Sequence, residues 1–270
     1  MLFNYDIEFQ KGTILTSEML TMMHKVPNAI INNLFVNQSD GIINGLNLQV
    51  EDNTLIVTSG IYKVGNRLYI SPKDRKFNSY MNKSFSPDKV YCLGFKGDKT
   101  ICDLKNPNIT THRIDLEIYP PSMESEYPNN ICQFYGKSGL RLPKDTTDLF
   151  KTRSAMDILN CKYSSLGEYT YHPYVFKLIY DKLKIKPNKH PLDYSFMMEI
   201  SHSGVIPKPM IREYIHATGK DIPQNDKDLL KVLIQSIDDL EFKVIASTPQ
   251  KNDTNTIDNP KATIGSGFLL

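Results

Sequence analysis

The chain has 270 residues, a formal net charge of +2 and 40% hydrophobic residues. This composition is ordinary for a soluble globular protein, and so small a net charge gives no support to nucleic-acid binding. No apolar run approaches the roughly 20 residues that cross a bilayer, so we expect no membrane insertion. The length allows one or two domains, and we favour two.

The start of the chain, residues 1–6, lacks the basic and apolar regions of a secretion signal, so we expect a protein made and folded in the cytoplasm. The cysteines fit that compartment because they are widely spread, with no Cys-x-x-Cys pair. We interpret them as small buried hydrophobic residues rather than as zinc or redox ligands. They are Cys92, Cys102, Cys132 and Cys161.

The N-terminal region predicts a short opening strand over residues 3–9, followed by a short helix. Thr16 or Ser17 can cap this helix, and we expect Pro27 to end it. The apolar stretch over residues 29–36 is too short for its periodicity to distinguish strand from helix, and we favour a strand.

Residues 41–70 carry the clearest strand pattern of the chain. Apolar and polar residues alternate over residues 46–50, which is typical of a strand with one buried face. Asp52-Asn53 and Gly65-Asn66 are turn sequences, and a Gly-Asn turn tolerates the positive φ of a tight hairpin. The stretch therefore predicts a β-meander.

Two further strands are predicted over residues 90–95 and 113–119. The first is continuously apolar at its start, which suits a strand covered on both sides, and the second alternates apolar with acidic residues. Pro120-Pro121 ends this region, and the polar residues 122–130 predict a loop.

The periodicity then changes to that of helices. Four helices are predicted, each with start or stop signals such as proline at the first turn, an Asn cap or a C-terminal glycine. Their starts lie near Pro173, near Pro191, after Pro207 and Pro209, and after Asn225, with Gly204 and Gly219 as stop signals.

The fold class that these elements predict is α+β. We expect an N-terminal β-rich domain over residues 1–150, a compact helical domain over residues 151–245 and an extended or disordered tail over residues 246–270. The tail ends in the apolar residues Phe268, Leu269 and Leu270. Two interpretations stay open for this tip: a frayed terminus, or an anchor that docks into a neighbouring subunit.

No motif for catalysis emerges. Gly136-Lys137-Ser138 resembles the end of a phosphate-binding loop, but Ile131 stands where that motif needs a glycine. Glu199 and His202 have the helical spacing of metal ligands, yet no second Glu-x-x-His accompanies them, which favours a solvated helical face.

A hydrolase that pairs Cys132 or Cys161 with a histidine stays open, because such partners meet in space rather than in sequence. We expect no enzyme, no cofactor and no metal. Several tyrosines could form a sugar-binding or protein-binding surface, although packing on half-buried strands is the more common role. They are Tyr62, Tyr69, Tyr163, Tyr169, Tyr171 and Tyr174.

Five short blocks resemble segments of phage-tail and contractile-injection baseplate proteins, including the baseplate protein of type VI secretion. They are GTILTSEM at residues 12–19, GIINGL at 41–46, SGIYKVG at 59–65, GLRL at 139–142 and PLDYSF at 191–196.

The resemblance implies a structural baseplate component of a phage tail or tail-like contractile particle, assembled in the bacterial cytoplasm. It implies a β-sandwich-like shell domain, a helical neck and a homotrimer that links the baseplate to tail fibres, receptor-binding proteins or other peripheral proteins. The partner-binding residues that we expect are Ile14, Leu15, Met19 and Met22, together with the tip residues Phe268, Leu269 and Leu270. The alternative is a carbohydrate-binding or receptor-binding module of a tail tip.

Overall fold

A computed structural model describes residues 14, 16–51, 54–77, 86, 89–97, 99–102, 110–127, 129–136, 141–151 and 155–240. The strand expected over residues 3–9 and the tail over residues 246–270 lie outside these residues. The helices are α1 (Ser17–Leu34), η1 (Pro121–Glu126), η2 (Asp148–Phe150), α2 (Pro173–Ile185), α3 (Pro191–Ser203), α4 (Lys208–His216) and α5 (Asp226–Asp239). The strands are β1 (Gly41–Gly45), β2 (Leu48–Glu51), β3 (Thr54–Val57), β4 (Gly60–Val64), β5 (Arg67–Ser71), β6 (Arg75–Phe77), β7 (Val90–Phe95), β8 (Lys99–Cys102), β9 (Thr110–Arg113), β10 (Leu116–Tyr119) and β11 (Asn129–Tyr135).

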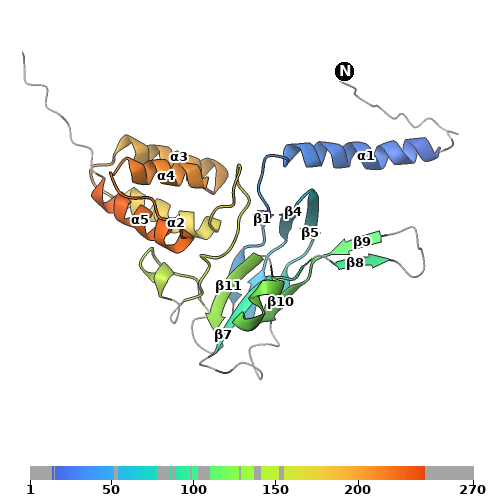
Figure 1. Ribbon diagram of the computed structural model, residues 1–270, viewed down its shortest axis with the longest axis horizontal. Coiled ribbons are helices and arrows are strands. Elements are labelled where there is room, and N and C mark those ends of the chain that lie inside the picture. Colours follow the sequence, from blue (N-terminus) through green and yellow to red (C-terminus); the bar gives the residue numbers. More distant parts are fainter. Residues whose placement is uncertain are drawn as a thin grey trace, which may run out of the picture.

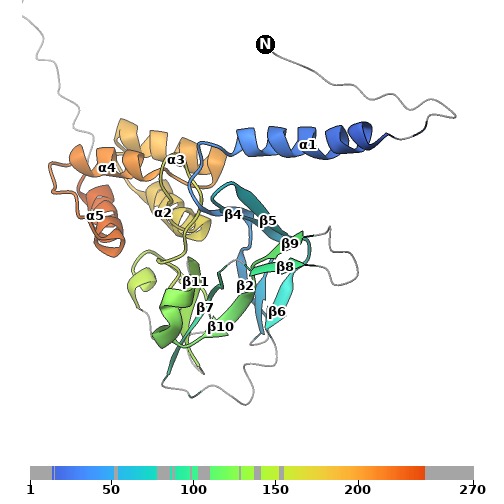
Figure 2. The same ribbon diagram turned by 45° about the vertical axis from the view of Figure 1, so that its right-hand side comes forward.

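The strands pair antiparallel in small sheets of order β1-β4-β5, β10-β7-β11, β2-β3-β6 and β8-β9. In both ribbon views helices α2 to α5 lie together above one side of these sheets, and α1 projects away from the rest of the molecule (Figures 1 and 2). Helices and antiparallel sheets in separate parts of the chain make this an α+β protein, as the sequence predicts.

The two predicted hairpins are present, but the single meander is wrong. β2 pairs with β3, and β4 pairs with β5 across the Gly65-Asn66 turn, yet these two hairpins belong to different sheets. The chain changes sheet twice, between β1 and β2 and again between β3 and β4. At the first change Gly45 and Leu46 both have positive φ, 68° and 52°, which interrupts the strand. Gly45 also packs so closely on the Ser59 carbonyl oxygen that a Cβ would lie 2.1 Å from it.

The central strand β7 has the predicted bounds and is covered on both faces, with Cys92 and Leu93 both fully buried. The strand expected over residues 113–119 is instead divided into β9 and β10 by Ile114 and Asp115. The loop expected over residues 122–130 is wrong as well. It contains η1 and the start of β11, because pairing with β7 stabilises a strand that its polar sequence does not favour.

Helix α1 runs through Pro27, so the predictions of a helix end at Pro27 and of a strand over residues 29–36 are both wrong. A proline inside a helix removes one hydrogen bond and kinks or weakens the helix without always ending it. The apolar residues Ile30, Ile31 and Leu34 continue the helical spacing begun by Leu20 and Met23, and no neighbouring strand is paired with this segment.

Helices α2, α3 and α5 begin where the sequence predicts, and α4 begins at Lys208, one residue before Pro209 rather than after it. His172 and His190 cap α2 and α3 by accepting the backbone N–H of Tyr174 and Leu192, and Asn225 caps α5 in the same way. Gly204 ends α3 in a left-handed conformation with φ of 75°. These residues predict the helix ends correctly because a capping residue affects only the first or last turn of its own helix.

Buried apolar side chains form one continuous cluster from Ile42 in β1 to Ile237 in α5. A second, smaller cluster lies on the other face of β7 and consists of Cys92, Tyr119 and Tyr127. Sheets and helices α2 to α5 therefore share one core, and the domain boundaries near residues 150 and 245 stay predictions.

Candidate functional site

The most prominent exposed apolar surface among the described residues is one face of α1. Thr16 fixes the start of the helix because its hydroxyl oxygen accepts the Met19 backbone N–H at 3.2 Å. Successive apolar residues then recur with the period of about 3.6 residues that places them on one side of a helix. They are Leu20 (51% exposed), Met23 (48%), Ile30 (56%), Ile31 (40%) and Leu34 (69%).

No side chain of α1 that the structure describes is buried, and the helix projects away from the sheets and from α2 to α5 in both ribbon views (Figures 1 and 2). Glu18 and Lys25 are its carboxylate and ammonium groups, and most of its other residues are apolar or amide side chains. We name the face formed by Leu20, Met23, Ile30, Ile31 and Leu34 the α1 face.

The partner-binding residues expected from the sequence are only partly brought together. Ile14 is 84% exposed just before α1, and Met19 and Met22 are half-buried on the helix. Leu15 and the tip residues Phe268, Leu269 and Leu270 lie outside the described residues. The α1 face itself was missed, although the helical spacing of its residues across Pro27 is a signal that the sequence contains.

At its C-terminal end α1 joins the body beside the β4-β5 hairpin. A pocket of about 210 Å³ opens there, between the last turn of the helix and Lys63, Asn66 and Leu68. The Lys63 ammonium donates to the Gln38 carbonyl oxygen and so ties the hairpin to the chain that leaves the helix. This junction sets the direction in which α1 projects.

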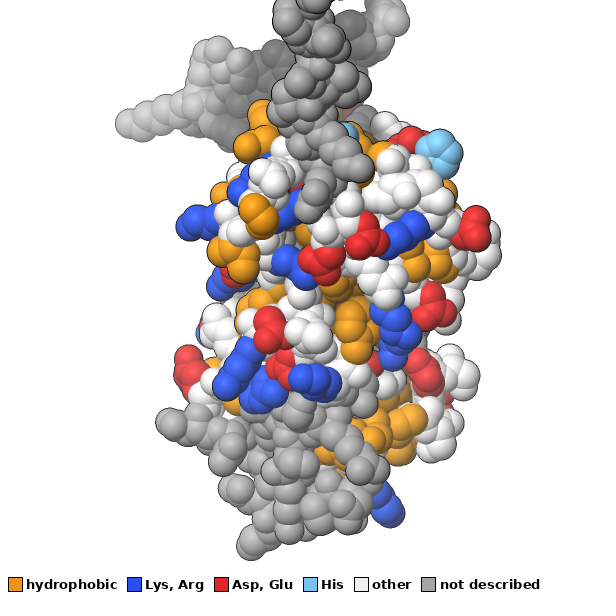
Figure 3. Space-filling model, turned by 90° about the vertical axis from the view of Figure 1, so that its left-hand side faces the viewer, with side chains coloured by type: hydrophobic (Ala, Val, Ile, Leu, Met, Phe, Trp, Pro, Cys, Tyr) orange, Lys and Arg blue, Asp and Glu red, His pale blue; other side chains and the backbone are white. Residues whose placement is uncertain are grey.

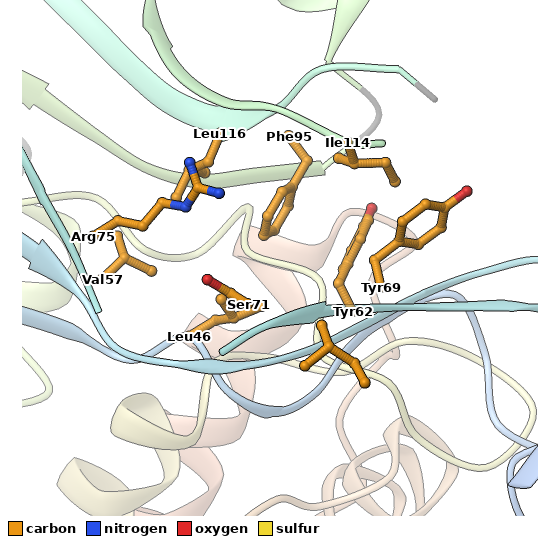
Figure 4. Close-up of a pocket in the computed structure, with 10 residues that line it drawn as sticks. Leu46, Val57, Tyr62, Tyr69, Ser71, Arg75, Phe95, Ile114 and Leu116 are labelled. Atoms are coloured by element: carbon orange, nitrogen blue, oxygen red, sulfur yellow. The ribbon is translucent and has the colours of Figure 1, made fainter. Parts of the chain in front are cut away.

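A gap of about 50 Å³ lies between the β1-β4-β5 sheet and the sheet centred on β7 (Figure 4). Tyr62 and Phe95 stack in it with ring centroids 4.3 Å apart, and the Arg75 side chain extends toward Leu116 (Figure 4). Known ligand pockets hold roughly 300–1,000 Å³, so this gap is a packing feature rather than a binding site.

The cysteine thiols that the structure describes are buried and unreactive. Burial raises the pKa of Cys92 to about 11 and raises the pKa of Cys132 and Cys161 further. A thiol acts as a nucleophile only as the thiolate, so these thiols are poor nucleophiles at neutral pH. The reading of Cys92, Cys132 and Cys161 as buried hydrophobic residues is confirmed. The side chain of Cys102 lies outside the described set.

Glu199 is half-buried and His202 is exposed on α3, which fits the solvated helical face that the sequence predicts. Within the described ranges, no three His, Cys, Asp or Glu side chains lie close enough to hold a metal ion. The Gly136-Lys137-Ser138 segment is described only at Gly136.

The predicted tyrosine surface divides into two groups. Tyr62, Tyr163 and Tyr171 are core residues, whereas Tyr69, Tyr169 and Tyr174 are half-buried. Packing is therefore the main role of this set, as expected.

The side of the molecule drawn in Figure 3 shows Lys and Arg side chains intermingled with Asp and Glu, with hydrophobic side chains between them. Nucleic-acid surfaces instead gather positive charge along one stripe. Of the helices described, none is long and apolar enough to cross a membrane.

No protein-family model matches the chain, and no curated protein matches it. Among solved structures, the one titled "Crystal structure of TssK" is similar, with a TM-score of 0.34 and 10% sequence identity over 86% of this chain and 69% of that chain. A TM-score this low does not establish a shared fold or a shared function.

Proposed function

We propose that this chain is a structural component of the baseplate of a phage tail or tail-like contractile particle, and that it holds other proteins in place rather than catalysing a reaction. The observation that carries the proposal is the α1 face, which is apolar and has no cover within the described part of the chain. The five sequence blocks that resemble baseplate proteins are the reason for proposing a baseplate as the assembly.

The energetics of α1 favour a partner. In proteins most of the stability of a helix comes from packing its apolar face against a neighbour. Pro27 lies inside α1, and an interior proline costs roughly 3 kcal/mol. Burying one Leu, Ile or Met side chain contributes about 1.5–3 kcal/mol, so covering several residues of the α1 face offsets that cost. Contact with another protein chain is the event that supplies this cover.

In the finer form of the proposal, the sheets make a sandwich-like shell domain and helices α2 to α5 make a bundle that serves as the neck. The protein is an oligomer, a homotrimer by the resemblance, located in the virion or particle baseplate. It links the baseplate to tail fibres, receptor-binding proteins or other peripheral proteins. The buried, protonated thiols of Cys132 and Cys161 support a role without catalysis.

Light scattering and co-purification test the proposal. The full chain, expressed together with the proteins encoded beside it, is expected to form a stable oligomer or a complex with tail proteins. A monomer that co-purifies with no particle protein contradicts the proposal.

A further inference from the structure

A polar pocket of about 350 Å³ lies where β11 and η1 meet the start of α5. Its volume falls in the range of known ligand pockets, roughly 300–1,000 Å³. Its lining includes Glu124, Asn130, Asn160, Lys162, Tyr169, Tyr171 and Asp226.

One wall of the pocket is held rigidly. The Lys208 ammonium is almost fully buried, lies 2.6 Å from Asp226 Oδ1 and lies 3.7 Å from the centre of the Tyr169 ring. The Tyr171 hydroxyl donates to the Asp226 carbonyl oxygen at 2.6 Å. The cation–π contact holds Tyr169 and the hydrogen bond holds Tyr171, so a ligand meets a wall that is already ordered.

Asn130 in the same pocket carries unused hydrogen-bonding capacity. The residue is 4% exposed, and neither its amide oxygen nor its amide nitrogen has a hydrogen-bond partner within the described structure. The amide does contact the Cys92 thiol, a weak hydrogen-bonding group, and this contact lowers the pKa of the thiol against the larger, opposing effect of burial. Leaving such a group unsatisfied costs about 1–3 kcal/mol, so a group that both donates and accepts is favoured beside it.

The charges around the pocket are balanced. Lys208 neutralises Asp226, and Lys162 is matched by Glu124 of opposite sign. An anion such as phosphate would meet the carboxylates of Glu124 and Asp226, and a cation would meet the Lys162 ammonium. A neutral ligand with several hydroxyl groups fits best, because each hydroxyl can both donate and accept.

We propose that this pocket binds a neutral saccharide, with Asn130 and Asn160 hydrogen-bonding to its hydroxyl groups and Tyr169 and Lys162 forming its rim. This binding goes beyond the proposed assembly role and does not depend on it. Ordered water is the other possible occupant of an unliganded polar pocket.

Saturation-transfer NMR on the isolated full chain tests the proposal, with glucose, galactose, mannose and N-acetylglucosamine as probes. At least one sugar is expected to bind saturably with a Kd on the order of 1 mM, a typical affinity for few hydrogen bonds. Asn160→Ala and Asn130→Leu are each expected to weaken that binding by about tenfold or more, the effect of one lost hydrogen bond. The control Asn32→Ala alters an exposed amide on α1 and is expected to leave sugar binding unchanged.

Two results overturn the proposal: no sugar binds, whether or not inorganic phosphate does, or sugar binding is equal in the wild type and Asn160→Ala. Asn160 is exposed, so its variant tests the site even where Asn130→Leu fails to fold. Because the chain is tested alone, failure to bind sugar does not affect the proposed assembly role. Failure to join a particle likewise does not affect the proposed sugar binding.

Discussion

The Lys186 ammonium lies 2.7 Å from Asp193 Oδ2, and the two side chains are only 8% and 0% exposed. The same carboxylate accepts the His190 backbone N–H at 2.8 Å and the Tyr214 hydroxyl. One buried charge therefore joins the end of α2, the start of α3 and the last turn of α4. We expect the arrangement of the helical part to depend on it.

Replacing Asp193 by Ala is expected to lower the free energy of unfolding by about 3–5 kcal/mol, because it leaves the Lys186 charge buried and unpaired. Urea unfolding measures the loss. Asp238 pairs with Lys182 at an exposed position, so Asp238→Ala is the control and should cost less than about 1 kcal/mol. Similar losses for both variants would show that the buried Lys186–Asp193 pair contributes no more to the free energy of unfolding than the exposed pair.

Gly45 and Gly65 both have positive φ, but their surroundings differ. A Cβ at Gly45 would lie 2.1 Å from the Ser59 carbonyl oxygen, whereas a Cβ at Gly65 would meet nothing within 4 Å. Gly65→Ala should therefore cost only the backbone strain of about 1–2 kcal/mol. Gly45→Ala adds a clash that typically costs a further 1–3 kcal/mol or so. Thermal unfolding that ranks the two variants in the opposite order would refute this account of how β1 meets β4.

His172 makes folding stability depend on pH. Burial lowers the pKa of its imidazole from 6.5 to about 3, and its Nδ1 accepts the Tyr174 N–H, which requires the neutral form. The unfolded chain binds the proton more readily, so stability present above pH 6.5 is lost as the pH falls toward 3. We expect a loss of about 1 kcal/mol per pH unit in this window.

Denaturation of wild type and His172→Asn at several pH values between 7 and 4 checks this expectation. Asn retains a side-chain acceptor for the helix cap but does not titrate. The variant should show a shallower pH dependence, whatever its stability at pH 7. Identical slopes for the two proteins would rule out His172 as the source.

Asn129 and Asn130 are neighbours on β11 whose side-chain amides differ in their hydrogen bonds. The Asn129 amide makes two hydrogen bonds of 3.1 Å with the Lys162 backbone, whereas the Asn130 amide makes none within the described structure. In the absence of ligand, Asn129→Leu should destabilise the fold by about 1–3 kcal/mol or more, while Asn130→Leu should cost less than about 1 kcal/mol. Chemical denaturation measures both changes. A larger loss for Asn130→Leu would mean that its amide is already satisfied.

The sequence predicts the helix starts at Pro173, Pro191 and Asn225 and the hairpin turn at Gly65-Asn66 because each depends on a few adjacent residues. It does not predict that β3 and β4 separate into two sheets, since strand pairing is decided by residues distant in the chain. Strand β11 was missed for the same reason, because β7 stabilises it from outside.

The candidate surfaces also differ in whether adjacent residues or residues distant in the chain form them. The sequence does contain a signal for the α1 face, because its helical spacing continues across Pro27. Taking that proline as the end of the helix leaves the face unrecognised. The polar pocket could not have been found, because Asn130, Tyr169 and Asp226 meet only after folding. Lys208 lies between two prolines and carries no sign in the sequence that it will be buried.

In the proposed function the α1 face contacts another protein in an assembled particle. The most direct measurement is the amount of this chain in purified particles from cells that carry the wild type, the double variant Ile30→Lys with Leu34→Lys, or the control Met198→Lys. Met198 is an equally exposed apolar residue on α3. We expect the double variant to fold but to be depleted from particles by about tenfold or more, the effect of losing a few buried apolar contacts. Incorporation of the double variant at the wild-type level, or absence of the wild-type chain from the particles, would contradict the account.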